Sequence, residues 1–177
     1  STDPLAQFAM VLSGLIHHVE DPGVSNARLL EERPDLITKY KKRSVVEPHS
    51  LESAWNLLMD KRFKDLQRCI FTNEYELRRF RQLMVNNVMA TDIFDEHAKT
   101  VREARWYNAF YTETTDEEEL TRLKASIVIE HIVQASLLSH TMQHWDVFTK
   151  WNERWFQEQY MAYDLGRSNN DPSDGWY

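Results

Sequence analysis

The sequence predicts an all-α fold, a compact array of several helices in one domain. Only four glycines and five prolines interrupt 177 residues, and the many leucines, glutamates, arginines and methionines favour helices over strands. Apolar residues recur at helical spacing in one segment after another, and no segment shows the strict alternation that is typical of strands. With 42% hydrophobic and 12% aromatic residues, the chain is long enough to bury one core.

The first helix is expected from Pro4 to the paired histidines His17 and His18. Asp3 or Thr2 can accept a hydrogen bond from the free N–H groups at its start. Proline suits the first turn because its φ is already helical and its missing N–H is not needed there. One apolar stripe runs along this helix, made of Leu5, Phe8, Leu12, Leu15 and Ile16.

Further helices follow from capping residues and apolar periodicity. A serine and a proline open two short helices, over residues 25–31 and 34–40. A capping box, Thr115 with Glu118 three residues later, predicts the start of a long helix that continues through the apolar positions up to 133. The remaining helical segments are expected over residues 48–60, 63–70, 72–91 and 143–165, and Gly166 ends the last of them.

The irregular parts of the chain also have signatures. A Lys-Lys-Arg run at 41–43 indicates a solvated loop, and residues 166–177, rich in Ser, Asn, Asp and Gly, indicate a loop-like tail. The chain opens directly on a helix start and stops on Trp176 and Tyr177. We therefore expect residues 1–177 to be a single partial domain, truncated at both ends, that works with other parts of a larger parent protein or with a protein partner.

Composition excludes some functions. A net charge of −7 without a concentrated Lys/Arg face argues against nucleic acid as a partner. The single cysteine, Cys69, cannot form an internal disulfide, which fits a reducing, cytoplasmic setting. The most apolar run, 125–138, is interrupted by Glu130 and His131 and is shorter than the roughly 20 residues that cross a bilayer. No membrane span is expected in this segment, which leaves membrane attachment of a parent protein open.

Residues 14–26, Gly-Leu-Ile-His-His-Val-Glu-Asp-Pro-Gly-Val-Ser-Asn, form the most informative motif. A helix ends on two adjacent histidines, and a Pro-Gly turn and a Ser-Asn helix start follow. From His17 onward the motif resembles the His-Asp-Val-Asp-His-Pro-Gly-Val-Ser-Asn signature of class I cyclic-nucleotide phosphodiesterases at seven of ten positions. The three departures are His18, Glu20 and Asp21.

Three further blocks resemble the same family and occur in its order. Residues 44–50, Ser-Val-Val-Glu-Pro-His-Ser, resemble Ser-Val-Leu-Glu-Asn-His-His, and residues 89–92, Met-Ala-Thr-Asp, resemble Leu-Ala-Thr-Asp. Residues 133–140 with Trp-Asn-Glu-Arg at 151–154 resemble Cys-Ala-Asp-Leu-Ser-Asn and a later Trp-x-x-Arg. The resemblance implies an all-helical HD-type catalytic domain that hydrolyses cAMP or cGMP to the 5′-monophosphate in signal transduction.

The resemblance also implies a site. In the family, two divalent cations such as zinc and magnesium are held by histidines and aspartates and activate water. His17 and His18 fall on metal-ligand positions, but His18 and Leu137 stand where the family has aspartates. Glu47 matches an acid beside the bridging water, and Asp21 replaces a histidine that orients the site. The substrate-pocket positions are Asn26, Thr91 and Asp92.

These replacements suggest impaired or lost activity. A neutral imidazole offers one lone pair and cannot readily bridge two cations, and leucine offers none, so metal binding in this chain is doubtful. If the chain is active, its partner is a cyclic nucleotide. The alternative is an inactive phosphodiesterase-like module that serves as a partner, regulator or nucleotide sensor. A third possibility is a single-metal phosphohydrolase that adds Glu20 or Glu47 to the two histidines.

Each candidate also has a purely structural explanation. The histidines at 17 and 18 can interact with the helix C-terminal dipole, worth ~0.3–1 kcal/mol, and Glu47 and Asp92 can be caps or turn formers. His131, His140 and His144 are better explained by packing or solvent exposure than by a metal triad.

Overall fold

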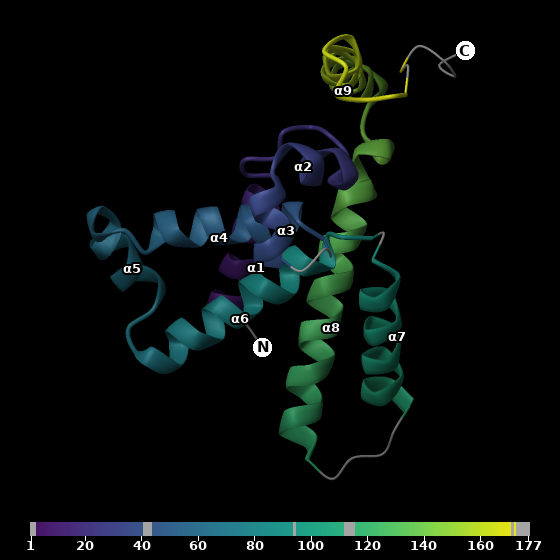
Figure 1. Cartoon of the computed structure of the whole chain (residues 1–177). Coiled ribbons are helices and arrows are strands. Elements are labelled where there is room, and N and C mark those ends of the chain that lie inside the picture. The colour runs from purple at the N-terminus through teal and green to yellow at the C-terminus, as the bar shows by residue number, and fades with distance from the viewer. Residues whose placement is uncertain (1–2, 41–43, 94, 112–115, 171, 173–177) are drawn as a thin grey trace.

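The computed structural model describes residues 3–40, 44–93, 95–111, 116–170 and 172. Within these residues every regular element is a helix, which confirms the predicted all-α class (Figure 1). The elements are α1 (Pro4–Ile16), α2 (Asn26–Glu32), α3 (Pro34–Tyr40), α4 (Val46–Leu58), η1 (Lys61–Phe63), α5 (Lys64–Ile70), α6 (Glu74–Ala90), α7 (Glu96–Tyr111), α8 (Glu117–Leu138), η2 (Ser139–Met142) and α9 (Trp145–Asp164).

The main core forms where α1 packs against α6, with α4 and α8 also touching α1. Ala9 of α1 is fully buried against Phe80, Met84 and Val88 of α6. Small residues on the inner side of α1 let the two helices approach closely. The hydroxyl of Ser13 donates one 2.7 Å hydrogen bond to the carbonyl oxygen of Ala9. This packing fixes the direction in which α1 delivers the paired histidines at its end.

A second, smaller core holds the short helices beside the first. It consists of Leu29, Leu36, Val45 and Val46, and these side chains join α2 and α3 to the start of α4. Because α2 follows the Pro-Gly turn and α4 begins at this core, the motif after α1 and the first turn of α4 are held near each other.

Helix α7 was not predicted. Its sequence mixes charged and aromatic residues without a continuous apolar stripe, and Ala109 is its one buried residue among those described. It lies alongside α8 (Figure 1), where the guanidinium of Arg105 makes 2.9 and 3.0 Å contacts with the buried carboxylate of Glu130. A helix held by an ion pair to a distant residue leaves little signal in its own periodicity.

The helix boundaries test the predicted caps. Asp3 accepts a 3.2 Å hydrogen bond from the N–H of Ala6, and Ser25 accepts one of 3.2 Å from the N–H of Arg28, as predicted. The capping box at Thr115 was wrong: the cap of α8 is Asp116, whose carboxylate accepts a 3.0 Å bond from the N–H of Glu119. Thr2 and Thr115 themselves lie outside the described residues.

Other boundaries shift by small amounts. Helix α4 begins at Val46 rather than 48 and ends at Leu58, α6 begins at Glu74 rather than 72, and α9 begins at Trp145 rather than 143. His140 lies in η2 and His144 caps α9, so one helix does not run through both. His131 Nδ1 lies 2.8 Å from the carbonyl oxygen of Ile127, and its ring packs on Trp106. A packing role for that histidine fits these contacts.

Helix α9 lies beyond the end of α8 at one extremity of the molecule (Figure 1). It ends where predicted, because Gly166 has φ of +67° and the N–H of Arg167 donates a 2.8 Å bond to the carbonyl oxygen of Ala162. Left-handed glycine with this backbone bond is a common way to end a helix. Residues 166–170 are irregular, as expected for the tail, and the predicted 41–43 loop lies outside the described residues. None of the described helices has the length and apolarity needed to cross a membrane.

Candidate functional site

The predicted motif forms a tight turn after α1. His17 is the residue that ends α1, and Glu20 has φ of +61°, a left-handed conformation that is uncommon for residues other than glycine. Asp21 Oδ1 accepts a 2.9 Å hydrogen bond from the N–H of Gly23, whose own φ is +68°. The turn therefore has a defined shape, set by two left-handed residues and one side-chain bond.

One ring nitrogen of His17 is held by the backbone of α1. Its Nδ1 lies 2.8 Å from the carbonyl oxygen of Gly14, which only accepts, so Nδ1 is the donor. Burial lowers the pKa of His17, and the neighbouring His18, whose ring centre is 4.2 Å away, lowers it further. The Nε2 lone pair of His17 is thus available to a single metal ion or a hydrogen-bond donor.

His18 and Asp21 form a pair. Nδ1 of His18 lies 2.7 Å from Oδ2 of Asp21. The hydrogen bond to Asp21 raises the pKa of His18, and the same bond lowers the pKa of Asp21. Both oxygens of Asp21 are therefore engaged, one by the imidazole and the other by the N–H of Gly23.

Glu47, in the first turn of α4, has a buried and unsatisfied oxygen. Within the described part of the chain, its Oε2 has no hydrogen-bond partner. Burial raises the pKa of Glu47, and the charges of Asp92 and Asp21 raise it while His18 lowers it. Among the predicted site residues, His18, Asp21 and Asp92 thus lie near enough to Glu47 for their charges to influence its pKa.

Asp92 follows the end of α6 and is buried. It accepts hydrogen bonds from Ser44 Oγ and, at 3.1 Å, from the N–H of Asp95. Thr91 ends α6, and its Oγ1 donates a 2.7 Å bond to the carbonyl oxygen of Val88. Both predicted pocket residues therefore also stabilise the chain between α6 and α7.

The remaining two predicted residues, Asn26 and Leu137, lie on α2 and α8. Asn26 is the first residue of α2 and is exposed. Leu137 lies half-buried in the last turn of α8, and its carbonyl oxygen is 2.8 Å from Nδ1 of His140. The assignment of Leu137 to a lost ligand position stays a prediction.

Glu20 faces α4. Its Oε2 accepts a 2.8 Å hydrogen bond from Ser53 Oγ and lies 3.1 Å from Nε2 of His49. Sequence reasoning missed both partners, although His49 belongs to the 44–50 block that resembles the family. The carboxylate considered for a single-metal site with the two histidines is thus engaged by α4.

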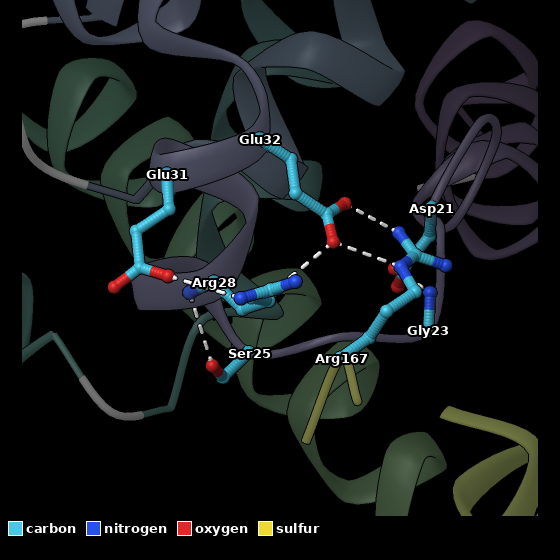
Figure 2. Close-up of polar contacts among 7 residues, drawn as sticks. All are labelled: Asp21, Gly23, Ser25, Arg28, Glu31, Glu32 and Arg167. Atoms are coloured by element: carbon cyan, nitrogen blue, oxygen red, sulfur yellow. Dashed lines mark hydrogen bonds and ion pairs between the residues drawn. The ribbon is translucent and has the colours of Figure 1, made fainter. Parts of the chain in front are cut away.

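A second missed contact joins the tail to α2, the helix that follows the motif. Arg167 contacts Glu32 with two bonds, Nε to Oε1 at 2.9 Å and Nη2 to Oε2 at 2.6 Å, and Arg28 adds a 2.9 Å bond (Figure 2). Arg167 lowers the pKa of Glu32 to about 2. A cavity of about 380 Å³ lies here, with Asp21, Glu32 and Arg167 among its lining residues. The loop-like composition of residues 166–177 gave no signal for this contact.

Helix α9 also approaches the turn directly. A Cβ on Gly23 would lie 2.5 Å from a carboxylate oxygen of Glu158. Glycine at this position therefore serves two purposes, since it supplies the left-handed backbone and leaves space for the side chain from α9.

The described residues do not fit a pair of divalent cations. No group of three or more His, Cys, Asp or Glu side chains among them is arranged to hold a metal ion. His17 and His18 can each offer Nε2, because Nδ1 of each ring has a hydrogen-bond partner, whereas both oxygens of Asp21 are engaged. Glu47 Oε2 is a buried carboxylate oxygen without a hydrogen-bond partner among the described residues, and two imidazoles with one carboxylate fall well short of two coordination shells.

Comparison with known proteins identifies the family. The sequence matches the family model of 3′5′-cyclic nucleotide phosphodiesterase over residues 1–174. It is 29% identical over 163 residues to the human dual specificity calcium/calmodulin-dependent 3′,5′-cyclic nucleotide phosphodiesterase 1C, covering 90% of this chain and 21% of that protein. With phosphodiesterase 1B of Mus musculus it shares 25% identity over 151 residues, which cover 85% of this chain and 26% of the relative. The chain thus spans about a fifth to a quarter of these relatives.

Solved structures support the same fold. The phosphodiesterase domain of Salpingoeca rosetta rhodopsin phosphodiesterase superposes with a TM-score of 0.67 at 22% identity, over 91% of this chain and 47% of that one. The phosphodiesterase domain of the RhoPDE fusion protein from the same choanoflagellate gives the same TM-score, over 93% and 50%. This chain therefore spans about half of each solved domain. The match over residues 1–174 settles its membership: the chain belongs to the 3′,5′-cyclic nucleotide phosphodiesterase family.

Proposed function

We propose that this chain is part of a phosphodiesterase catalytic domain in which metal-dependent hydrolysis of cAMP and cGMP is impaired or lost. The observation that carries the proposal is that His18 and the N–H of Gly23 engage both oxygens of Asp21, the carboxylate of this turn that could otherwise face a cation. Cytoplasmic location and a larger parent protein belong to the same proposal.

The chemistry explains why this matters. A pair of divalent cations, when bound, activates water and stabilises charge on the phosphate. Among the described residues of the site, His17 and His18 can each supply Nε2, because their Nδ1 atoms have partners, and Glu47 supplies one unsatisfied carboxylate oxygen. Burial raises the pKa of Glu47, which makes the loss of the proton that metal binding requires less favourable. The proposed pocket residues Asn26, Thr91 and Asp92 can persist without the hydrolytic step.

A second candidate function is an inactive interaction or regulatory module. It is favoured by the outer side of α1, where Val11 and Leu15 are 60% and 74% exposed and no charged residue accompanies them. Exposed apolar surface of this kind often marks an interface. The two candidates are compatible, since a domain that no longer hydrolyses its substrate can still bind partners.

The test uses a chimera, because the chain spans about half of the solved domain. The 177 residues replace the matching segment of the Salpingoeca rosetta phosphodiesterase domain. Purified chimera and parent domain are equilibrated with zinc and magnesium, bound metal is measured by plasma mass spectrometry, and hydrolysis of cAMP and cGMP is followed. We expect a folded chimera with far less metal than the parent and no measurable hydrolysis. Two equivalents of metal with turnover would overturn the proposal, and one equivalent would favour a single-metal site.

A further inference from the structure

A cavity of about 350 Å³ lies between α6, α7 and α8. Helix α8 packs against both of the other helices, and the apolar part of the lining consists of Met89, Ala90, Ala98 and Val101. The motif at 17–26 contributes none of the described residues that line this cavity. The cavity is therefore separate from the turn that holds His18 and Asp21.

Arg102, on α7, lines this cavity without a partner for its charge. It is half-buried, and among the described residues it has no hydrogen-bond acceptor, no carboxylate at ion-pair distance and no aromatic ring beneath its guanidinium. Every other arginine in the described ranges forms an ion pair with Asp or Glu or lies over an aromatic ring. Arginine keeps its charge at any ordinary pH, and a partly desolvated charge without a counter-charge is unfavourable. An anion in the cavity would therefore stabilise Arg102.

The other charged side chains of the lining are already engaged. Arg105 makes 2.9 and 3.0 Å contacts with the two carboxylate oxygens of Glu130, so this pair adds no net charge. Asp95 caps α7, where its carboxylate accepts a 3.0 Å hydrogen bond from the N–H of Ala98. The positive end of the helix dipole partly offsets the charge of Asp95 at this place.

The uncharged polar side chains of the lining offer further donors. The side-chain oxygen of Asn86 accepts a 2.7 Å hydrogen bond from Gln82, so the amide N–H groups of Asn86 are left to donate. His97 is exposed, and its ring carries at least one N–H. The hydroxyl of Ser44 already donates to Asp92. An acceptor group on a bound molecule thus has Asn86 and His97 beside Arg102.

We propose that this cavity binds a small carboxylate with an apolar body and that Arg102 holds the carboxylate. A planar guanidinium pairs with a carboxylate through two parallel N–H···O bonds, and the apolar residues of the lining suit an apolar remainder. A phosphate monoester suits the cavity less well, because it carries close to two negative charges and would lie near the carboxylates of Asp95 and Glu130. The proposal does not depend on whether hydrolysis is lost.

The test measures the binding of benzoate, which joins a carboxylate to an apolar ring, to the 177-residue chain by NMR at constant ionic strength. Benzoate should shift the amide signals of Ala98 and Val101 saturably, with a Kd on the order of 1 mM. Benzamide, which has nearly the same shape without the charge, and inorganic phosphate should each bind at least about fivefold more weakly. Arg102→Met should weaken benzoate binding about tenfold while the helical circular dichroism stays unchanged. Arg102→Lys keeps the charge without the planar fork and should retain part of the affinity.

Arg122→Met is the matched control. Arg122 lies on α8 with a side chain 62% exposed, in a 3.8 Å pair with Glu118, and its loss should leave the Kd of benzoate unchanged. An equal loss of affinity in the two methionine variants would mean that benzoate associates with surface arginines in general, and it would overturn the proposal. The proposal also fails if benzamide binds as tightly as benzoate, or if folded Arg102→Met keeps the original affinity. Phosphate binding tighter than benzoate binding would overturn the assignment of a carboxylate. Metal content and hydrolysis do not enter this readout, so its failure is separate from failure of the proposed function.

Discussion

Nδ1 of His18 lies 2.7 Å from Oδ2 of Asp21, and these two positions carry exchanged residue types relative to the family signature, which the sequence resembles as His-Asp-Val-Asp-His. The exchange keeps one acid and one imidazole in the turn. It also moves the carboxylate three residues along the chain, to a place where the N–H of Gly23 holds its second oxygen. Because the two side chains contact each other directly, removal of either one should change the pKa of the other and the stability of the fold.

The first prediction concerns the pH range in which this pair stabilises the fold. The raised pKa of His18 gives stability that is fully present below its ordinary value of 6.5 and is lost as pH rises through the folded value. The lowered pKa of Asp21 gives stability that is present above 3.8 and is lost as pH falls through its folded value. Asp21→Asn should therefore destabilise most between about pH 4 and 6.5.

The effect should be small. His18 is 64% exposed, so solvent screening limits the ion pair to about 0.5 kcal/mol. Urea unfolding at several pH values measures it, and NMR titration of His18 should show its pKa falling in Asp21→Asn. The double variant with His18→Gln completes the cycle. A pKa for His18 that does not change on removal of Asp21 would contradict the contact.

The second prediction concerns Glu47. Its folded pKa is raised by burial, so ionisation of Glu47 destabilises the folded state. This loss of stability is absent below pH 4.5, the ordinary pKa, and is complete once the pH exceeds the folded pKa. Glu47→Gln resembles the protonated acid and should stabilise the chain by about 1 kcal/mol at pH 7.5 and by nothing near pH 4. Urea unfolding at the two pH values measures the difference.

A control separates burial from the helix dipole. Glu74→Gln removes an acid from the first turn of α6, where its side chain is 66% exposed. It should lose a few tenths of a kcal/mol at pH 7.5 through the dipole and the Arg78 pair. The idea about Glu47 fails if both glutamine variants change stability in the same direction.

Local features of the sequence predicted the parts of the fold that local chemistry determines. Asp3 and Ser25 cap their helices because the acceptor and the free N–H groups are three residues apart, and Gly166 ends α9 through its own backbone. Helix α7 was not predicted, because Arg105 contacts a partner that is 25 residues away and on another helix. Long-range ion pairs leave no periodic signature.

The contacts of the candidate site also divide into local ones, which the sequence predicted, and long-range ones, which it did not. His18 and Asp21 are three residues apart, and the motif that contains them was visible in the sequence. The contact between Arg167 and Glu32 spans 135 residues, so no local pattern in the sequence predicts it. The unsatisfied oxygen of Glu47 could not be predicted from the sequence either, since burial is a property of the assembled helices.

The third prediction addresses the ion pair that holds α7. Glu130 is buried, with a side chain 4% exposed, whereas Arg105 is 32% exposed. Glu130→Gln leaves the guanidinium without its counter-charge and should cost about 1–3 kcal/mol, less than for a fully buried pair. Arg105→Met with Glu130→Leu should recover much of that loss. Glu118→Gln, in an exposed pair 3.8 Å from Arg122, is the control and should be nearly neutral in urea unfolding.

The fourth prediction concerns the link between the tail and α2. Arg167 is the main cause of the lowered pKa of Glu32, about 2, so Arg167→Met should raise that pKa toward its usual value of 4.5. NMR titration of the Glu32 carboxyl measures it. Arg28 still contacts Glu32, and part of the lowering should remain. Arg154→Met removes another guanidinium, one that lies over the ring of Trp151 on α9; it is not among the causes of the lowered pKa of Glu32 and should leave the titration of Glu32 unchanged.

The last prediction restores oxygen donors to the two altered metal positions. His18→Asp together with Leu137→Asp, made in the Salpingoeca rosetta chimera, should raise bound zinc or magnesium toward about two equivalents and bring measurable cyclic-nucleotide hydrolysis. His18→Asp alone should gain less, because one carboxylate cannot complete both shells.

The matched control replaces Leu138 instead of Leu137. Leu138 is the next residue on α8 and is 57% exposed, and a residue one position along a helix points about 100° away. Equal metal uptake with aspartate at 137 or 138 would mean that the added charge acts nonspecifically. A gain at 138 alone would mean that the lost ligand position has been assigned one residue too early. Only a gain confined to Leu137→Asp would support the idea that hydrolysis disappeared through the loss of these two carboxylates, while the helices that position them were kept.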